Sequence, residues 1–258
     1  MIMVDLNCDL GESFGPWKMG CDEEIIPLVS SANIACGFHG GDPLVMRRTV
    51  ALVKKHGAAA GAHPGFPDLA GFGRRQMALS FEEVKAAVQY QVGALDGFCR
   101  AADIPLVHVK PHGALYNMAA KDMELARAIA EAVKEINPRL ILLVLAGSCM
   151  VKAARDAGLT AAQEVFADRS YEEDGSLSPR SKPGSLITSE DEALNRVVGM
   201  VKTGKVRTLT GREISVTADS VCIHGDGEKA LLFAQKLTGA FAAGGISVAP
   251  LSQICRRL

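Results

Sequence analysis

The sequence predicts an α/β fold, a (β/α) barrel of about seven parallel strands that takes up residues 1–258 as a single domain. Short apolar segments alternate with longer amphipathic ones along the chain, which is typical of strand–helix repeats. The short segments are almost continuously apolar, as parallel strands are when both faces of the sheet are covered. Polar residues follow several of these segments, and the carboxyl ends of barrel strands converge on one face.

A doubly wound open sheet is the main alternative, because it has the same alternation of strands and helices. The chain has neither a GxGxxG motif after its first strand nor a Walker A motif, which disfavours the common nucleotide-binding open sheets. Seven or eight strand–helix units in 258 residues suit a barrel better.

The predicted strands are short apolar segments of four to six residues. They comprise residues 3–8, 32–36, 58–62, 106–109, 140–145, 162–167, 221–224 and 246–249.

The predicted helices lie between these strands, and two of them begin with a capping box, at Ser80 with Glu83 and at Ser189 with Glu192. The helices comprise residues 43–56, 80–103, 122–136, 148–157, 189–203 and 227–243. Two segments interrupt the alternation. Residues 169–187, rich in Ser, Pro and Gly, predict a long loop that covers a substrate, and residues 206–217 predict a small β-hairpin.

The charge and the cysteines exclude several functions. A net charge of −1 gives no general attraction to nucleic acid or to a membrane surface. The seven cysteines form no CxxC pair and read as small buried side chains in a reducing compartment. The N-terminus does not resemble a signal peptide, and the longest apolar run, residues 140–147, is too short to span a bilayer. We therefore expect a cytoplasmic protein that binds neither nucleic acid nor membrane.

Titratable and polar side chains lie at the ends of six predicted strands, where a barrel would bring them around one cavity. One such histidine alone is more often structural, but four strands that end in histidine favour a functional site. Gly and Pro flank most of these positions and allow sharp turns that present backbone N–H groups to an anion. The residues are Asp5, Asn7 and Asp9; His39; His63; Lys110 and His112; Glu164, Asp168 and Arg169; and His224 and Asp226.

Five sequence strings resemble the LamB/YcsF family, in the same order and over essentially the whole chain. They are DLNCDLGES (5–13), SANIACGFHGGD (31–42), GAHPGFPD (61–68), VKPHGALYN (109–117) and HGD (224–226). The resemblance implies a barrel like those of glycoside hydrolases and deacetylases. It also implies the A subunit of a prokaryotic 5-oxoprolinase (ATP-hydrolysing), which works with subunits B and C. That complex converts 5-oxo-L-proline, ATP and water into L-glutamate, ADP and phosphate.

The mechanism hypothesised from these residues is water attack on a lactam that phosphorylation has activated. Because the chain shows no nucleotide-binding loop, the ATP-dependent step is expected mainly in the partner subunits. Asp9 or His63 is the candidate general base, and His39 and His112 are the candidate acids for the ring nitrogen. The predicted substrate-binding residues are Lys110, Asp168, Arg169, His224 and Asp226.

Two other functions stay open at this point. A metal-dependent deacetylase or amidohydrolase would use Asp5, Asp9, His39 and His63 to hold a divalent metal. A non-catalytic subunit that binds a lactam or sugar would only scaffold its partners. A tightly held structural ion is not expected, because the chain has no thiolate-rich or HExxH motif.

Lys110 has two interpretations. It is either a charge partner of Asp9 or another strand-end acid, or a clamp for a substrate anion, and the anionic substrate favours the clamp. The clamp predicts that Lys110→Met lowers ring-opening efficiency by roughly tenfold to over a hundredfold and leaves thermal stability nearly unchanged.

Overall fold

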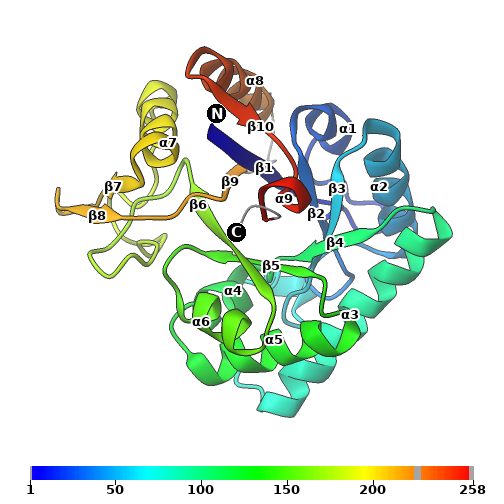
Figure 1. The fold of residues 1–258 in the computed structure, drawn as a ribbon. Helices are drawn as coiled ribbons and strands as arrows, with labels where there is room; N and C mark the ends of the chain where they lie inside the picture. Colours follow the sequence, from blue (N-terminus) through cyan, green and yellow to red (C-terminus); the bar gives the residue numbers. More distant parts are fainter. Residues whose placement is uncertain (1, 224–227, 256–258) are drawn as a thin grey trace.

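A closed ring of parallel strands forms the centre of the molecule (Figure 1). The structure is a computed structural model, and it describes residues 2–223 and 228–255. Each strand pairs with the next in parallel, and the last pairs back with the first, so the predicted barrel is confirmed. The ring consists of β1 (Ile2–Leu10), β2 (Ser31–Ala35), β3 (Ala59–His63), β4 (Leu106–Val109), β5 (Ile141–Leu145), β6 (Thr160–Phe166) and β9 (Ser220–Ile223).

The last predicted strand is present, but it is not one of the seven strands that close the ring. β10 (Ile246–Val248) pairs with the first residues of β1, where Ile2 lies opposite Ile246. The next residues of β1 pair with β9, beginning with Asp5 opposite Ser220. Because β1 is nine residues long, it accommodates both neighbours in succession.

Helices surround the ring and cover the outer face of its strands (Figure 1). Ser80 and Glu83 form the complete capping box that was predicted. At Ser189 only half of the predicted box forms, in which the Ser189 side chain accepts a hydrogen bond from the Glu192 N–H. The long helices are α2 (Pro43–His56), α3 (Phe81–Ala101), α5 (Met123–Ile136), α6 (Cys149–Asp156), α7 (Glu190–Thr203) and α8 (Glu228–Ala243).

Short helices occur where the sequence predicted none. α9 (Leu251–Ile254) covers the amino-terminal end of the barrel, where the buried Leu251 packs in one apolar cluster with Ile141 and Leu143. α4 (Gly113–Ala119) follows β4 at the opposite end. The other short helices are α1 (Asp22–Ile25), η1 (Ile26–Leu28) and η2 (Leu69–Gly71).

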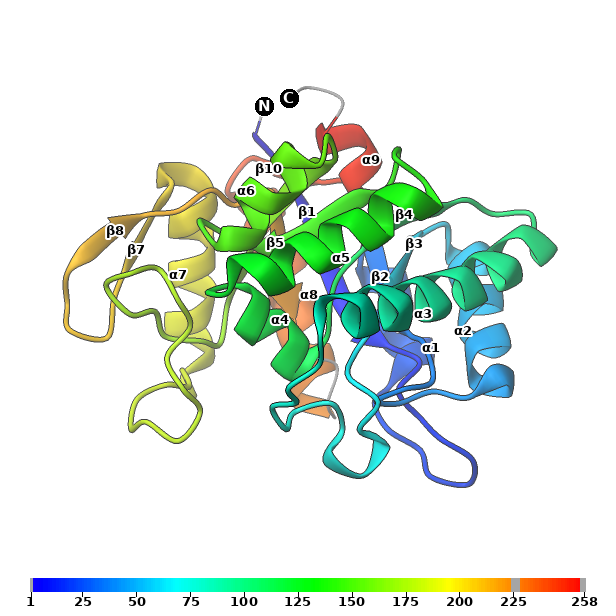
Figure 2. The same ribbon diagram turned by 90° about the horizontal axis from the view of Figure 1, so that it is seen from below.

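The carboxyl-terminal end of the barrel carries the long loops. Figure 2 shows the loops after β1, β3 and β6 on the side opposite α9 and the two termini. The loop of residues 169–187 is tied together by bridges from Arg169 to Leu186 and from Tyr171 to Leu177. Tyr171 is fully buried, and its hydroxyl accepts a hydrogen bond from the Phe166 N–H at the end of β6. The long loop is therefore anchored to the barrel at its start.

The predicted hairpin is present as the antiparallel pair β7 (Lys205–Arg207) and β8 (Glu213–Ser215). All seven cysteines are free thiols; Cys8, Cys36, Cys99 and Cys222 are buried as expected, whereas Cys21, Cys149 and Cys255 are only partly buried. None of the helices in residues 2–223 and 228–255 combines the length and the apolar composition that a bilayer crossing requires.

Candidate functional site

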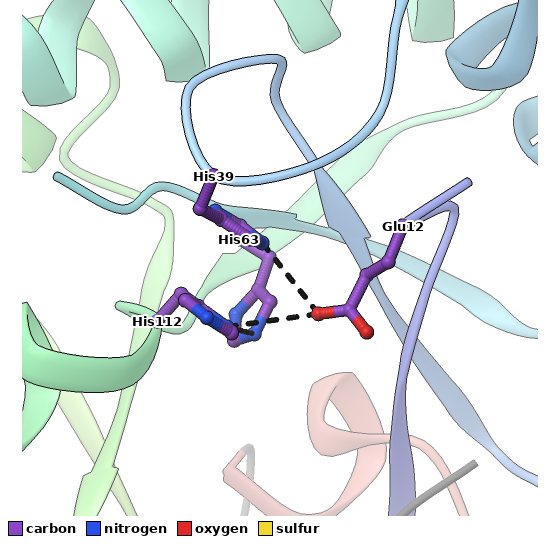
Figure 3. Close-up of side chains that lie close together, drawn as sticks. All are labelled: Glu12, His39, His63 and His112. Atoms are coloured by element: carbon purple, nitrogen blue, oxygen red, sulfur yellow. Dashed lines mark hydrogen bonds and ion pairs between the residues drawn. The ribbon is translucent and has the colours of Figure 1, made fainter. Parts of the chain in front are cut away.

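Four residues at the ends of three strands and in the loop after β1 converge at the mouth of the barrel. We call Glu12, His39, His63 and His112 the His–Glu cluster, and one potential ligand atom from each lies within 4.8 Å of the others. Glu12 follows β1, His39 follows β2, His63 ends β3 and His112 follows β4. Figure 3 shows the Glu12 carboxylate directed at the rings, with Oε1 3.5 Å from His39 Nε2 and 3.6 Å from His112 Nδ1.

Backbone carbonyls fix the tautomers of two of these imidazoles. His63 Nδ1 lies 2.6 Å from the Lys110 carbonyl oxygen, and His112 Nε2 lies 2.8 Å from that of Phe72. A carbonyl oxygen only accepts hydrogen bonds, so both nitrogens must carry the proton. The neutral rings then turn the lone pairs of His63 Nε2 and His112 Nδ1 toward each other at 3.0 Å. Two facing lone pairs need a shared proton or a metal cation between them.

His39 is buried without the hydrogen bonds that a buried imidazole normally makes. Its exposed fraction is 0%, and neither ring nitrogen has a hydrogen-bond partner in the part of the chain that the structure describes. The ring stacks on His112 with 3.6 Å between centroids and 2° between planes. Gly65 leaves room for it, because a Cβ there would lie 2.6 Å from His39 Nδ1. The packing thus holds the ring in place and leaves its nitrogens available to a ligand.

Burial favours the neutral form of His39 and His112. Loss of solvation lowers the pKa of His112 to about 3, and the neighbouring His63 adds to the effect. The pKa of His39 falls well below its usual range for the same reason, with His112 as the next cause. Neutral rings are poor proton donors, so these pKa values disfavour the acid roles suggested for His39 and His112 from the sequence. They favour a role as ligands.

The His–Glu cluster fits a divalent cation. Three imidazoles and a carboxylate form a ligand set typical of zinc and related metals. The protonated nitrogens of His63 and His112 donate to backbone carbonyls, which is how metal-binding histidines are usually oriented. Neither Glu12 nor His112 was predicted from the sequence as a metal ligand, although Glu12 lies in the same motif as Asp9.

Asp9 lies beside the His–Glu cluster and is partly open to the cavity. Its Oδ2 is 3.3 Å from His63 Nε2, while Oδ1 accepts hydrogen bonds from Lys110 Nζ at 2.9 Å and Asn33 Nδ2 at 2.8 Å. The side chain is 19% exposed, more than any histidine of the cluster. One carboxylate oxygen is therefore held in place while the other faces the cluster.

Lys110 lies beneath this site as an ion-pair partner, which is the less favoured of the two interpretations from the sequence. Its Nζ is 2.9 Å from both Asp9 Oδ1 and Glu164 Oε1, and the side chain is 3% exposed. Burial alone would lower its pKa, but the Asp9 carboxylate, with Cys222 and Glu164, raises the pKa well above the usual range. Glu164 is fully buried, and its other oxygen accepts a hydrogen bond from the Tyr116 hydroxyl at 2.8 Å.

Asp5, a candidate metal ligand from the sequence, is not one of the four residues of the His–Glu cluster. Alternation along β1 places Asp5, Asn7 and Asp9 on one face, but the registers place Asp5 at the level of Ser220 and Asp9 at the level of Asn33. Asp5 Oδ1 accepts hydrogen bonds from the hydroxyls of Ser30 and Ser31, and Oδ2 accepts one from Ser220. Burial raises the pKa of Asp5 to about 6, although these hydrogen bonds oppose the change.

His108 lies on the interior face of β4. Its Nε2 donates a hydrogen bond to Asn33 Oδ1 at 2.7 Å, and its exposed fraction is 0%. Gly61 on the adjacent strand makes this possible, because a Cβ there would lie 2.0 Å from His108 Nε2.

A cavity of about 750 Å³ opens above this network. Asp9 and three members of the His–Glu cluster, Glu12, His63 and His112, line it on one side. Arg74, Arg169 and Arg180 line it where the loops after β3 and β6 approach. Arg169 was predicted as a binding residue. Asp168 is not among the residues that line the cavity, and His224 and Asp226 lie outside the described residues. Arg180 and Glu12 were not predicted from the sequence as site residues.

Comparisons with known proteins identify the family to which this chain is similar. The model of the LamB/YcsF family matches residues 4–256. A protein from Clostridium beijerinckii, named as the A subunit of 5-oxoprolinase, is 59% identical over 254 residues, which cover 98% of this chain and 100% of the relative. The crystal structure of the lactam utilization protein from Thermus thermophilus is 54% identical, with a TM-score of 0.91 and coverage of 96% of this chain and 99% of that one.

A more distant structure shares only the fold. A deacetylase solved with its substrate has a TM-score of 0.51 at 14% identity and covers 99% of this chain and 92% of its own. The likeness to deacetylase barrels that the sequence predicted is therefore confirmed at the level of architecture.

Proposed function

The chain belongs to the LamB/YcsF family, and we propose that it is the A subunit of an ATP-dependent 5-oxoprolinase and performs the hydrolytic opening of the lactam ring. The names of its relatives support this role. The observation that supports this chemistry is the His–Glu cluster beside Asp9, where three imidazoles and two carboxylates meet at one end of the barrel. Subunits B and C would be its partners and would carry the ATP-dependent activation of the lactam.

The reaction needs water to attack an amide carbon that is a poor electrophile. A divalent cation held by Glu12, His39, His63 and His112 would supply a Lewis acid that favours deprotonation of water. Among the chain's own groups, Asp9 is the base of choice, because its Oδ2 faces the cluster and is partly exposed. Lys110 and Asn33 orient that carboxylate through its other oxygen.

Proton movement follows from the same carboxylate. Asp9 takes the proton from water as the oxygen bonds to the ring carbonyl carbon. The bond between that carbon and the ring nitrogen then breaks, and Asp9 passes the protons of the attacking water to the nitrogen. The acyl phosphate that remains on the carbon is hydrolysed by a second water to L-glutamate and phosphate. This route needs no imidazolium, in keeping with the lowered pKa values of His39 and His112.

The test is reconstitution with subunits B and C and measurement of glutamate formed from 5-oxo-L-proline and ATP. His63→Ala should lower turnover by at least about a hundredfold, whereas His56→Ala, an exposed histidine at the end of α2, should leave it unchanged. Chelation should abolish activity, and added zinc, cobalt or manganese should restore it.

Other outcomes would support the competing functions. Amide or acetyl hydrolysis by the chain alone, without ATP or partners, would favour the metal-dependent deacetylase. Full turnover of the complex with His63→Ala and Asp9→Asn would make the chain a scaffold and refute the proposed catalytic site.

A further inference from the structure

Three arginines line the same cavity without an ion-pair partner among the described residues. Arg74 comes from the loop after β3, and Arg169 and Arg180 come from the loop after β6. Within residues 2–223 and 228–255, none of the three forms an ion pair with a carboxylate, although the adjacent Arg75 pairs with Asp68. Cations that gather at a cavity without paired counter-charges indicate a site for an anionic ligand.

Arg169 gives the strongest indication. It is 6% exposed, one terminal nitrogen donates to the Ser178 carbonyl oxygen at 2.6 Å, and its buried Nε has no hydrogen-bond partner among the described residues. A buried guanidinium without a paired carboxylate is costly unless a ligand neutralises it. Burial lowers its pKa, and the nearby charges of Arg180 and Arg74 contribute to that shift, whereas the Asp168 carboxylate opposes it.

Phe72 places Arg74 next to the His–Glu cluster. The guanidinium carbon of Arg74 lies 5.0 Å from the Phe72 ring centroid. The same ring packs edge-on against His39 at 5.7 Å and His112 at 5.1 Å. An anion held by Arg74 would therefore lie beside the place where the reaction is proposed to occur.

We propose that Arg74, Arg169 and Arg180 form a subsite that binds the phosphoryl group of a phosphorylated substrate beside the His–Glu cluster. The inference rests on the proposed function, in which the lactam is activated by phosphorylation before water attacks. Three guanidinium groups match the charge and the several acceptor oxygens of a phosphoryl dianion better than those of one planar carboxylate. Arg169 and Arg180 both belong to the long loop, so the bound phosphoryl group also joins that loop to the loop after β3.

The test is calorimetric titration of the isolated chain with inorganic phosphate, after chelation so that phosphate cannot bind through a metal. Arg74→Met and Arg180→Met are the main variants, because both side chains are exposed and their loss should not affect folding. Each should weaken phosphate binding about tenfold or more, as expected for the loss of a charge-assisted contact. Arg127→Met, an exposed arginine on α5, serves as the control and should bind like the wild type.

Three results would overturn the subsite. These are no phosphate binding by the wild type, equal binding by the arginine variants, or tighter binding of acetate than of phosphate. Binding lost in His63→Ala but kept in Arg180→Met would place phosphate at the His–Glu cluster instead. The titration uses neither the lactam nor the partner subunits, so failure of the 5-oxoprolinase assay and failure of the subsite can be told apart.

Discussion

The barrel interior contains two polar layers that differ in how completely their hydrogen bonds are satisfied. In the lower layer, Asp5 accepts hydrogen bonds from Ser30, Ser31 and Ser220. At the mouth, two imidazole lone pairs face each other, and both nitrogens of His39 lack a hydrogen-bond partner among the described residues. Buried groups that satisfy one another stabilise the fold, whereas buried groups that cannot do so within the chain indicate where a ligand belongs.

Lys110 joins the two layers. It pairs with Asp9 above and Glu164 within the barrel, and its Nζ also donates to Asn7 Oδ1 at 3.1 Å. The Asn7 amide in turn donates to the Ser220 hydroxyl of the lower layer. Substitutions of Lys110 and of residues in the lower layer should therefore change the free energy of unfolding. Substitutions in the His–Glu cluster should instead change the affinity for a ligand. Four substitutions test this contrast.

Lys110→Met should cause the largest loss of stability, about 3–5 kcal/mol, because it removes the cation between two carboxylates that remain buried or half-buried. Chemical denaturation measures the change. Lys121→Met is the control, since Lys121 lines the same cavity but is 63% exposed. An unchanged unfolding midpoint combined with reduced turnover would instead support the interpretation of Lys110 as a clamp for a substrate anion.

Asp5→Asn should alter how stability depends on pH. The folded pKa of Asp5 is raised to about 6 from 3.8, so the native state binds its proton more tightly than the unfolded state does. The stabilising contribution of protonated Asp5 is complete below the unfolded pKa and is lost as the pH rises through the folded pKa. Wild-type stability relative to Asp5→Asn should thus fall by on the order of 2–3 kcal/mol between about pH 4 and about pH 6. Parallel stability curves would contradict the raised pKa.

Gly61→Ala should destabilise the protein by about 1–3 kcal/mol, because the added methyl group overlaps the His108 ring and displaces it from Asn33. Gly93→Ala on α3 is the matched control, since a Cβ there meets no atom within 4 Å. The control should be neutral or slightly stabilising. Equal melting temperatures for the two variants would show that His108 can move at no cost.

His39→Leu should have the smallest effect on stability, within about 1 kcal/mol in the metal-free protein, because no hydrogen bond within the described chain is lost. Its affinity for zinc should nevertheless fall by about a hundredfold or more, as measured by competition with a chelator. Unchanged zinc affinity, or a stability loss as large as that of Lys110→Met, would remove the distinction between the two layers.

The barrel itself could be predicted from local patterns. Apolar segments, helix-capping residues and the polar residues at strand ends are all local properties, and the observed strands and long helices follow them closely. The short helix α4 was missed because Gly113 and the preceding Pro111 predict a turn, while the buried Leu115 and Tyr116 stabilise the helix through tertiary packing.

The candidate site could be predicted only in part, because side-chain partners depend on strand register and loop path. Alternation places Asp5 and Asp9 on one face, but only the pairing of β1 with β2 and β9 separates them into two layers. Glu12 lies beyond the end of β1, so its approach to the histidines depends on how that loop turns.

The sequence by itself determined that this chain forms a parallel barrel with acidic and histidine side chains at its carboxyl-terminal strand ends, because periodicity and motif position are encoded locally. Only the tertiary structure decided which of these groups satisfy one another. Burial, strand register and the positions of the Lys110 and Phe72 carbonyls made Lys110 an ion-pair partner and left the imidazole lone pairs facing one another. These are relations between distant segments, and they form only when the ring of strands closes.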